Sequence, residues 1–559
     1  MSFSVDLTVQ PLGPAARPAL APSAASSGAS ETLRALGALG AIAAIDVGSN
    51  SIHMIVVEPE PNGAYRVLGR EREMVRLGRS AFGLVGEGGN LSEQAMEDGL
   101  LALVKMITLA SLRGARRIVA VATSAVREAA NGEEFLARVR AQTGVEVRRL
   151  SGEDEGALIY RAVREVVDLG GGDAAIVDVG GGSTEWVATR DGELSSVASL
   201  ALGSLRCSAA LDADPPGPRA IGRLRRTIRG RLKAEVAEGK VARLVATSGT
   251  AVCCADLIAH FSAAARAPAA APPRAAKSGL REVKLRDLSA LVERLARLPR
   301  AAVAALPSVG APRAESLLAG AILIEELARH AGVSRFLVSD RALREGLVLA
   351  ALGQPIPRGD DPGDLRRRQV LRLAERVESV HAHGLQTARL AVRLFDLTAS
   401  LHDLGPRERE WLEYAALLHD IGYSIHYRKH HEHSLYLIEN AALDAFDPTE
   451  VEIVARVARF HRGAPPSPKH PALAGSKPWQ QRTIRTLAAL LRLADALDRT
   501  HASRVEQLYC SIRPKRVKLE VISPYAVDLE LEAALHHGRL FEKVFGRRLA
   551  VRQGLETAV

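Results

Sequence analysis

The chain has 559 residues, of which 47% are hydrophobic and 25% are charged, a composition typical of globular proteins with more than one core. The formal net charge of +10 favours a polyanionic partner such as a phosphate-rich substrate, although an arginine-rich coding bias would give the same excess. Four cysteines without a CxxC pair exclude a disulfide framework, and the lack of a long apolar run excludes a membrane-spanning helix, so we expect a cytoplasmic protein that does not bind membranes.

The first ordered element is expected near residue 41. Residues 1–40 are rich in alanine, proline and serine and lack the pattern of a secretory signal, so we expect a disordered tail. An apolar strand at residues 41–45 then ends in Asp46, which is followed by Gly48 and small polar residues. In the rest of this first domain, residues 41–150, we expect strands at residues 52–58, 65–77, 117–122 and 145–150 and helices at residues 92–112 and 133–142.

The second part of the chain repeats this design. The stretch AAIVDVGGGSTEW, residues 174–186, places Asp178, three glycines, two hydroxyls and Glu185 after an apolar run, as AAIDVGSNSIHMIV does around Asp46. VATS also recurs, at residues 121–124 and 245–248, in the same order. Two landmarks in one order predict a duplicated α/β domain. The second copy would span residues 151–352, with an exposed Ala/Pro-rich loop at 263–278, a final helix that is a candidate to pack back on the first domain, and a linker at 353–363.

The repeated loops predict a phosphate site. Glycines directly after a strand let the backbone turn tightly and bring its N–H groups close to an anion. Two such loops on facing domains would bind one phosphate chain from both sides. For either loop taken by itself, a simple hairpin turn is the alternative interpretation. The candidate phosphate-binding residues are Gly48, Ser49, Asn50, Ser51, Gly180, Gly181, Gly182, Ser183 and Thr184, and the candidate magnesium ligands are Asp46 and Asp178.

Hydrolysis would also need a charge stabiliser and a carboxylate that activates water. Arg127 follows the strand at residues 117–122 and is the candidate stabiliser. Glu153, Asp154 and Glu155 precede a helix at the junction of the two copies, where each could instead be a charge favoured by the helix dipole. The residues alone leave the three acids as equivalent candidates.

These motifs together resemble the exopolyphosphatase/guanosine pentaphosphate phosphatase family, which has the duplicated, ribonuclease-H-like fold of the actin and sugar-kinase superfamily. The resemblance extends from about residue 41 to residue 352 and is carried by AIDVGSNSIHMIVVE, VATSAVREA, LSGEDEGALIY, VDVGGGSTEWV, LGS at residues 202–204 and ATSGT at residues 246–250. It implies that Glu155 is the water-activating glutamate, that Arg127 is the arginine after the Thr-Ser pair, and that Asp178 is the magnesium-associated aspartate. It also implies a homodimer.

Residues 364–505 have a helical pattern and contain most of the histidines. Histidine and aspartate side chains from separate helices can form a mixed N/O site for a divalent metal, although histidines that only cap helices are the alternative. The candidate ligands are His383, His419, Asp420, His461 and Asp495, with His431 and His433 for a second ion and with His381 and Asp498 as alternatives to His383 and Asp495. The region resembles the all-α HD phosphohydrolase domain, which implies ligand positions at His383, His419, Asp420 and Asp495. Alternation at residues 517–522 and 527–531 predicts a small α+β module at residues 506–559.

We therefore expect a phosphoric anhydride hydrolase that removes terminal phosphate from inorganic polyphosphate with the help of magnesium. Guanosine pentaphosphate, cut at its 5′ γ-phosphate, is the alternative substrate. A polyphosphate or nucleotide sensor is the alternative without catalysis, and a kinase-like transferase ranks last because no adenosine-pocket signature is present. Nucleic acid is not expected as a partner. The sequence does not fix the preference between the two substrates, the chain-length preference, the processivity, the oligomeric state, or the metal and activity of the helical domain.

Overall fold

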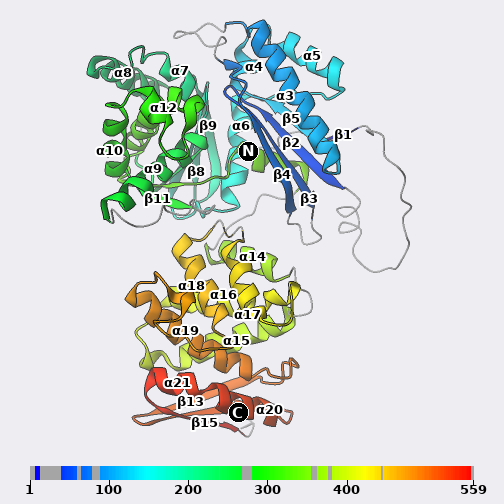
Figure 1. Cartoon of the computed structure of the whole chain (residues 1–559), viewed down its shortest axis with the longest axis vertical. Coiled ribbons are helices and arrows are strands. Elements are labelled where there is room, and N and C mark those ends of the chain that lie inside the picture. The colour runs from blue at the N-terminus through cyan, green and yellow to red at the C-terminus, as the bar shows by residue number, and fades with distance from the viewer. Residues whose placement is uncertain are drawn as a thin grey trace. The chain divides into compact units, whose positions relative to one another are not determined.

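The computed structural model describes residues 7–12, 40–59, 65–78, 89–237, 239–266, 280–353, 362–375, 381–441, 443 and 445–554. The chain divides into two compact units, Met1–Pro362 and Gly363–Val559 (Figure 1). In the described ranges, no helix has the length and hydropathy that a membrane span requires.

Two mixed sheets form the framework of the first unit (Figure 1). The first sheet has the order β1-β5-β2-β3-β4, with β6 also paired to β5, and the second has the order β11-β12-β10-β7-β8-β9. The strands of the first sheet are β1 (Gln10–Pro11), β2 (Ala41–Val47), β3 (Ile52–Pro59), β4 (Tyr65–Glu73), β5 (Ala115–Ala122) and β6 (Arg148–Arg149). Those of the second are β7 (Asp173–Val179), β8 (Thr184–Arg190), β9 (Glu193–Leu200), β10 (Arg243–Thr247), β11 (Arg281–Lys284) and β12 (Arg335–Val338).

The two sheets repeat one topology. Strand β2 is parallel to β5 and antiparallel to β3, and β3 is antiparallel to β4. In the second sheet, β7 is parallel to β10 and antiparallel to β8, and β8 is antiparallel to β9. Asp46 and Asp178 therefore lie on equivalent strands, and the predicted α/β class and internal repeat are confirmed.

Alternation along the strands separates three layers of core. In β2, Ala43 and Ile45 belong to a core on the outer face, whereas Ile42 and Ala44 belong to a core that also contains Ile176 of the second sheet. Helices α6 (Gly152–Arg164) and α13 (Leu343–Ala351) pack together in this shared core, and α13 also contacts β2 and β3. The end of the second copy thus packs on the first sheet.

Further helices cover the outer face of each sheet (Figure 1). The first copy supplies α3 (Glu93–Leu112), α4 (Ser124–Glu128) and α5 (Gly132–Thr143). The second copy supplies α7 (Ser204–Ser208), α8 (Pro218–Glu235), α9 (Gly249–Arg266), α10 (Leu285–Leu295), α11 (Arg300–Ala304) and α12 (Gly310–His330). The predicted start of α3 is confirmed, because the Ser92 hydroxyl accepts a hydrogen bond from the Ala95 N–H at 3.2 Å.

The second unit combines a helical bundle with a small sheet that shares its core. Its helices are α14 (Pro362–Ala374), α15 (His381–Leu397), α16 (Pro406–Leu418), α17 (His430–Glu439), α18 (Pro448–Arg459), α19 (Pro478–Ala496), α20 (Asp528–His537) and α21 (Arg539–Phe545). Short 3₁₀ turns lie at Ala399–Leu401, Ile421–Ser424 and Pro471–Leu473. The sheet pairs β13 (Gln507–Arg513) antiparallel with β14 (Arg516–Ile522), and β15 (Arg548–Gln553) adds parallel to β14.

Four details of the structure differ from the prediction. Within the predicted tail, β1 pairs with β5, and the Gln10 side-chain amide also bonds the backbone N–H and carbonyl of Glu146. Residues 1–6 and 13–39 lie outside the described part. The predicted strand at residues 145–150 is reduced to β6, and the predicted strand at residues 527–531 lies in α20. Helix α9 continues into the predicted loop at 263–278, and residues 267–279 are not described.

A stability prediction follows from the contact between α6 and α13. A Cβ atom on Gly346 of α13 would lie 2.1 Å from the backbone oxygen of Leu158 in α6, so two backbones occupy the space that a side chain would need. We expect Gly346→Ala to lower the free energy of unfolding by about 1–3 kcal/mol or more, measured by urea denaturation. Gly222→Ala in α8 is the control, because a Cβ there meets no atom within 4 Å. Equal unfolding midpoints for the two variants would contradict this packing.

Candidate active site

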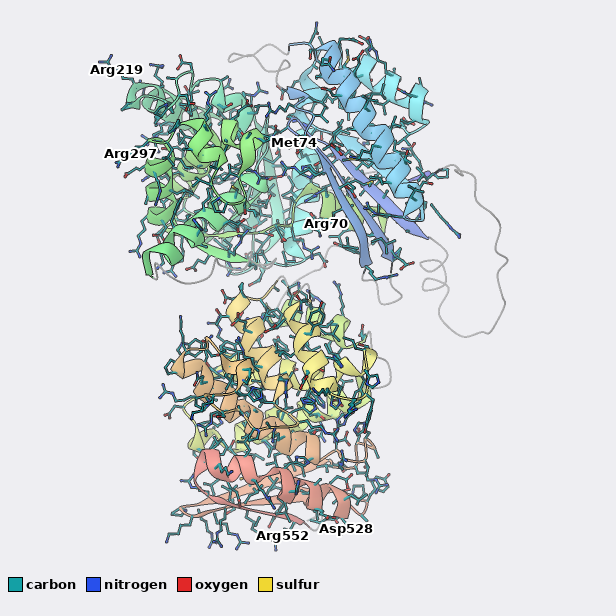
Figure 2. The ribbon with its side chains drawn as sticks, viewed as in Figure 1. Arg70, Met74, Arg219, Arg297, Asp528 and Arg552 are labelled. Carbon is teal, nitrogen blue, oxygen red and sulfur yellow. The ribbon has the colours of Figure 1, made fainter. Side chains whose placement is uncertain are left out.

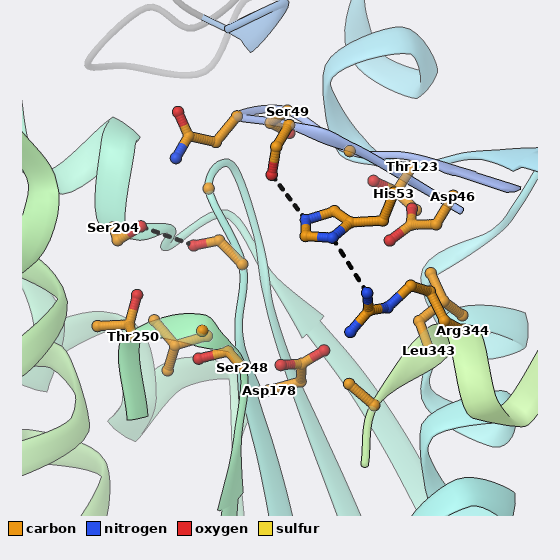
Figure 3. A pocket seen from close by; sticks show the side chains of 18 of the residues that line it. Asp46, Ser49, His53, Thr123, Asp178, Ser204, Ser248, Thr250, Leu343 and Arg344 are labelled. Carbon is orange, nitrogen blue, oxygen red and sulfur yellow. Dashed lines mark hydrogen bonds between the residues drawn. The ribbon is translucent and has the colours of Figure 1, made fainter. Parts of the chain in front are cut away.

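The two Asp-Gly loops line one cavity of about 470 Å³ between the two sheets of the first unit (Figure 3). Each loop is closed in the same way: the Gly48 N–H donates to the Ser51 carbonyl at 3.2 Å, and the Gly180 N–H donates to the Ser183 carbonyl at 3.0 Å. The loops also approach each other, because a Cβ atom on Gly181 would lie 3.2 Å from the Cβ atom of Ser49. The predicted two-sided arrangement is therefore present.

Most of the predicted phosphate-binding residues line the cavity, and two do not. The lining includes Gly48, Ser49, Asn50, Ser51, Gly180, Gly181 and Ser183. Gly182 and Thr184 lie outside it; the Gly182 carbonyl accepts from Arg206, and the fully buried Thr184 hydroxyl donates to the Leu202 carbonyl. The Gly48 and Gly180 N–H groups are occupied by the turns themselves. Phosphate binding by Gly48 and Gly180 stays a prediction, whereas Gly182 and Thr184 have other partners in this structure.

Asp46 and Asp178 face the cavity from equivalent strands (Figure 3). Burial raises the pKa of Asp46 to about 7 and that of Asp178 to about 6. The Asp178 Oδ1 accepts a hydrogen bond from the Thr247 hydroxyl at 2.8 Å, whereas the buried Oδ1 of Asp46 has no hydrogen-bond partner within the described residues. An unpartnered carboxylate oxygen beside a second carboxylate fits a hard divalent cation such as Mg²⁺.

Glu185 is a further acid at this site that was absent from the predicted ligand set. It lies directly opposite Asp178 in the β7–β8 pair, so both side chains project from the same face of the sheet. Glu185 is fully buried, accepts from the Ser199 hydroxyl at 2.9 Å, and has a pKa raised to about 7 by burial and by the charge of Asp178. The hairpin register is the signal that could have identified it.

The structure separates the three candidate acids at the start of α6. The Ser151 hydroxyl caps this helix by accepting from the Asp154 N–H at 3.0 Å. Glu155 is then buried and lines the cavity, whereas Glu153 is exposed and Asp154 forms an ion pair with Arg148 at 3.3 Å. Burial and the nearby charge of Glu185 raise the pKa of Glu155 well above its usual range.

Arg127 holds Glu155 in place. Its Nη1 donates to the Glu155 Oε2 at 3.0 Å and to the Leu150 carbonyl at 3.1 Å. The guanidinium is absent from the cavity lining, so the predicted direct contact with the substrate is not supported by its placement. Its position instead fits a positioning role for Glu155.

His53 links the first loop to α13 (Figure 3). The His53 Nδ1 lies 3.2 Å from Arg344 Nη1, and its Nε2 lies 2.7 Å from the Ser51 hydroxyl. Because a guanidinium can only donate, Nδ1 accepts and Nε2 carries the proton that is donated to Ser51. Burial and the charges of Arg344, Arg72 and Arg313 lower the pKa of His53 to about 3, which keeps the ring neutral. The Ser51 hydroxyl proton is then directed away from the ring and is available to an anion.

Several other lining residues were not assigned from the sequence. They are Ser204 of LGS, Ser248 and Thr250 of ATSGT, and the arginines Arg72, Arg313 and Arg344. The two short motifs contributed to the family resemblance without a role. The residues next to each arginine in the sequence do not indicate a role in the site, because the three arginines reach the cavity from three different elements.

The second unit contains a separate buried cluster of histidines and aspartates. Two groups of potential metal-binding atoms share Asp420: one with His383 and His419, and one with His430 and His461. The Asp495 Oδ1 lies 3.2 Å from His383 Nε2 and 3.6 Å from His419 Nε2. All five predicted ligands therefore come together, and His430 is a member that the sequence analysis missed.

The histidine orientations in this cluster follow from their outer partners. The Nδ1 atoms of His419, His461 and His430 lie 2.7, 2.6 and 3.1 Å from the carbonyls of residues 416, 458 and 427. A carbonyl can only accept, so each Nδ1 carries the proton and each Nε2 presents a lone pair to the centre. This is the pattern of metal-binding histidines.

The same geometry distinguishes Asp495 from Asp498 as the candidate ligand. Asp498 accepts from His383 Nδ1 at 2.8 Å on the outer side of the ring, whereas Asp495 lies on the inner side, so Asp495 is the candidate ligand and Asp498 orients His383. His431 and His433, the candidates for a second ion, are absent from both groups. The side chain of His381 is outside the described part.

The cluster fits a bound cation. The buried His419 Nε2 and Asp420 Oδ1 have no hydrogen-bond partner among the described residues. Neighbouring histidines and the nearby aspartates place several lone pairs within a small volume, which a divalent ion would stabilise.

Comparison with known proteins links both units to one family. A family model described as Ppx/GppA phosphatase family matches residues 55–354, and one described as Ppx/GppA phosphatase, domain III, matches residues 365–539. Exopolyphosphatase 1 of Mycobacterium tuberculosis is 33% identical over 309 residues, 55% of this chain and 87% of the relative. Exopolyphosphatase 1 of Mycobacterium leprae is 31% identical over 313 residues, 55% of this chain and 88% of the relative. The crystal structure of the Aquifex aeolicus member of the Ppx/GppA family shares 26% identity, with 56% of this chain and 97% of that chain covered and a TM-score of 0.47.

The raised pKa values predict a pH-dependent stability without metal. A carboxyl group whose pKa is higher in the folded than in the unfolded protein stabilises the fold below its unfolded pKa, and this stability is lost as pH rises through the folded pKa. For Asp46 the loss falls between about pH 4 and pH 7. We expect Asp46→Asn to be more stable than the wild type at pH 8 in a chelator and equally stable at acidic pH, measured by thermal unfolding. The exposed Asp212→Asn is the control, and magnesium should reduce the difference.

Proposed function

Because the chain belongs to the Ppx/GppA phosphatase family, we propose that it hydrolyses the terminal phosphate of inorganic polyphosphate in the cavity between the two Asp-Gly loops. The observation that carries this proposal is Glu155, a buried carboxylate held by Arg127 at the wall of a cavity formed by both loops. The names of the mycobacterial relatives favour polyphosphate as the substrate.

In the proposed reaction, the loops hold the terminal phosphate while Glu155 removes a proton from a water molecule. The water oxygen bonds to the terminal phosphorus, the bridging P–O bond breaks, and orthophosphate and a chain shorter by one unit leave. Burial raises the pKa of Glu155, which makes its carboxylate a stronger base than that of an exposed glutamate. Arg127 keeps the carboxylate oriented.

We propose Asp46 and Asp178 as the residues that hold Mg²⁺ in this cavity, where the ion would neutralise charge on the phosphate oxygens. Ser51 and Ser183 contribute hydroxyl groups at the loops, and His53 keeps the Ser51 proton free for a phosphate oxygen.

We also propose a metal centre in the second unit, with Asp420 shared between two divalent ions. His383, His419 and Asp495 would hold one ion, and His430 and His461 would hold the other. Bound water at such a centre can act on phosphoesters, and the cluster is chemically separate from the Asp-Gly loops.

The first test is a comparison of Glu155→Gln with Glu153→Gln. We expect Glu155→Gln to lower phosphate release from polyphosphate by about 10²–10⁴-fold, because it removes the base without a large change in shape. Glu153→Gln should retain wild-type activity, since Glu153 is exposed on the same helix. Normal activity in folded Glu155→Gln would exclude the proposed mechanism.

The same assay separates the alternative functions. Phosphate release from guanosine pentaphosphate, measured beside polyphosphate, identifies the preferred substrate. Tight binding without phosphate release would indicate a sensor, and transfer to ADP would indicate a kinase.

The second test concerns the metal centre. We expect His430→Ala to lower the divalent metal bound after loading with Mn²⁺ or Zn²⁺ by about one ion per chain, as measured by elemental analysis. His433→Ala on the same helix should retain the wild-type metal content, because His433 lies outside both groups. Equal metal content in the two variants would contradict the proposed second ion.

A further inference from the structure

The short helix α7 holds the carbonyl groups of the second Asp-Gly loop. The Ser204 N–H donates to the Gly180 carbonyl at 2.9 Å, and the Arg206 N–H donates to the Gly181 carbonyl at 3.1 Å. The Arg206 Nε donates to the Gly182 carbonyl at 2.8 Å. Three consecutive glycine carbonyls therefore have partners on α7, and the position of this loop depends on the position of that helix.

The side chain of Arg206 also reaches the first copy of the repeat. Its Nη2 forms an ion pair with the Glu128 Oε2 at 2.5 Å. The pair is shielded from water, because only 13% of the Arg206 side chain and 30% of the Glu128 side chain are exposed. A charge-assisted hydrogen bond in this setting constrains the two side chains more than an exposed surface ion pair does. One guanidinium thus binds the second loop through Nε and the first copy through Nη2.

Helix α4, which carries Glu128, makes two further contacts in the site. The Ser124 Oγ at its start lies 2.8 Å from the Ser49 Oγ of the first loop. Arg127, the residue before Glu128, donates to the Glu155 Oε2 at 3.0 Å. One helix of five residues therefore contacts the first loop directly, holds the proposed base, and is linked to the second loop by the ion pair.

The second loop has little freedom to move independently of α7. A Cβ atom on Gly203, which precedes α7, would lie 2.2 Å from the Gly181 carbonyl oxygen, so the two backbones are in close contact. On the side that faces the first loop, a Cβ atom on Gly181 would lie 3.2 Å from the Ser49 Cβ. A shift of α7 relative to α4 would therefore change the distance between the two loops.

We propose that Arg206 is a positioning residue that fixes the second loop relative to Glu155 by means of Glu128 and α4. This inference rests on the proposed function of the cavity. Attack on the terminal phosphorus requires the water at Glu155 and the phosphate at the second loop to keep one relative position, because a displacement of about 1 Å can slow a reaction about 100-fold. Arg206 does not line the cavity, so it acts through its neighbours.

The test is steady-state hydrolysis of long-chain polyphosphate by Arg206→Gln and Glu128→Ala. We expect kcat to fall about 10- to 100-fold while KM changes by less than about 3-fold, because the groups in the cavity remain but their relative position is lost. The double variant should have about the same kcat as Arg206→Gln alone, since both changes break one link. Arg206→Lys should recover part of kcat, because its ammonium keeps the charge but cannot replace both donors.

Two control variants separate position from stability and from charge. Arg225 pairs with Glu325 at 2.6 Å between α8 and α12 and does not line the cavity. Arg225→Gln should lower the thermal unfolding midpoint, as Arg206→Gln does, but should retain the wild-type kcat. Arg297 is exposed between α10 and α11 at the outer side of the second copy (Figure 2). Arg297→Gln should change neither quantity.

Wild-type kcat in folded Arg206→Gln, or a rise in KM with unchanged kcat, would overturn the positioning role and leave the proposed function intact. If Arg206→Gln does not fold, Glu128→Ala decides the matter, because it leaves the contacts of α7 with the loop in place. A wild-type enzyme that releases no phosphate from polyphosphate would instead exclude the proposed function. Circular dichroism of each variant shows whether the fold is retained.

Discussion

Four carboxylates buried together are the constraint on which the first unit depends. Asp46, Asp178, Glu155 and Glu185 come from both sequence copies, and burial raises the pKa of each. A buried ionised carboxylate is costly unless it is hydrogen-bonded or paired with a cation. The fold supplies Thr247 to Asp178, Arg127 to Glu155 and Ser199 to one oxygen of Glu185. Within the described residues, the buried Asp46 Oδ1 and Glu185 Oε2 have no hydrogen-bond partner. In this part of the chain the four carboxylates thus have one ion pair between them, with Arg127, and a divalent cation is the group that would complete the site.

The features that the sequence predicts well are local. An apolar run followed by aspartate and glycine indicates a strand and a tight loop, and its recurrence indicates the repeat. The direction of a single side chain depends on contacts that this pattern does not contain. The Thr184 hydroxyl turns toward Leu202 because of the pairing of β8 and β9, and Glu155 differs from Glu153 only through the rotation that the cap at Ser151 imposes on α6.

In the second unit, too, the sequence does not show which side chains at the start of a helix face the interior. The run His430, His431, Glu432, His433 does not fix which ring faces the interior, because adjacent positions on a helix differ by about 100°. The structure selects His430, since α17 begins there and its ring stacks on Tyr423 beside His461. The choice between Asp495 and Asp498 was similarly open, because both contact His383, on opposite ring nitrogens. Only the positions of the other candidate ligands show that Asp495 faces the centre of the cluster and that Asp498 lies on the outer side of His383.

The duplication is regular in its backbone and unequal in its chemistry. Asp46 and Asp178 occupy equivalent positions, but the residue opposite them is His53 in the first copy and Glu185 in the second. Glu185 adds negative charge beside Glu155, which raises the pKa of Glu155 and favours a nearby cation. His53 is neutral and accepts from Arg344, which brings a positive charge to the first loop. The cavity therefore carries carboxylates and guanidinium groups together. Such a mixture suits a phosphate group, because carboxylates can hold a metal ion and guanidinium groups can neutralise phosphate oxygens.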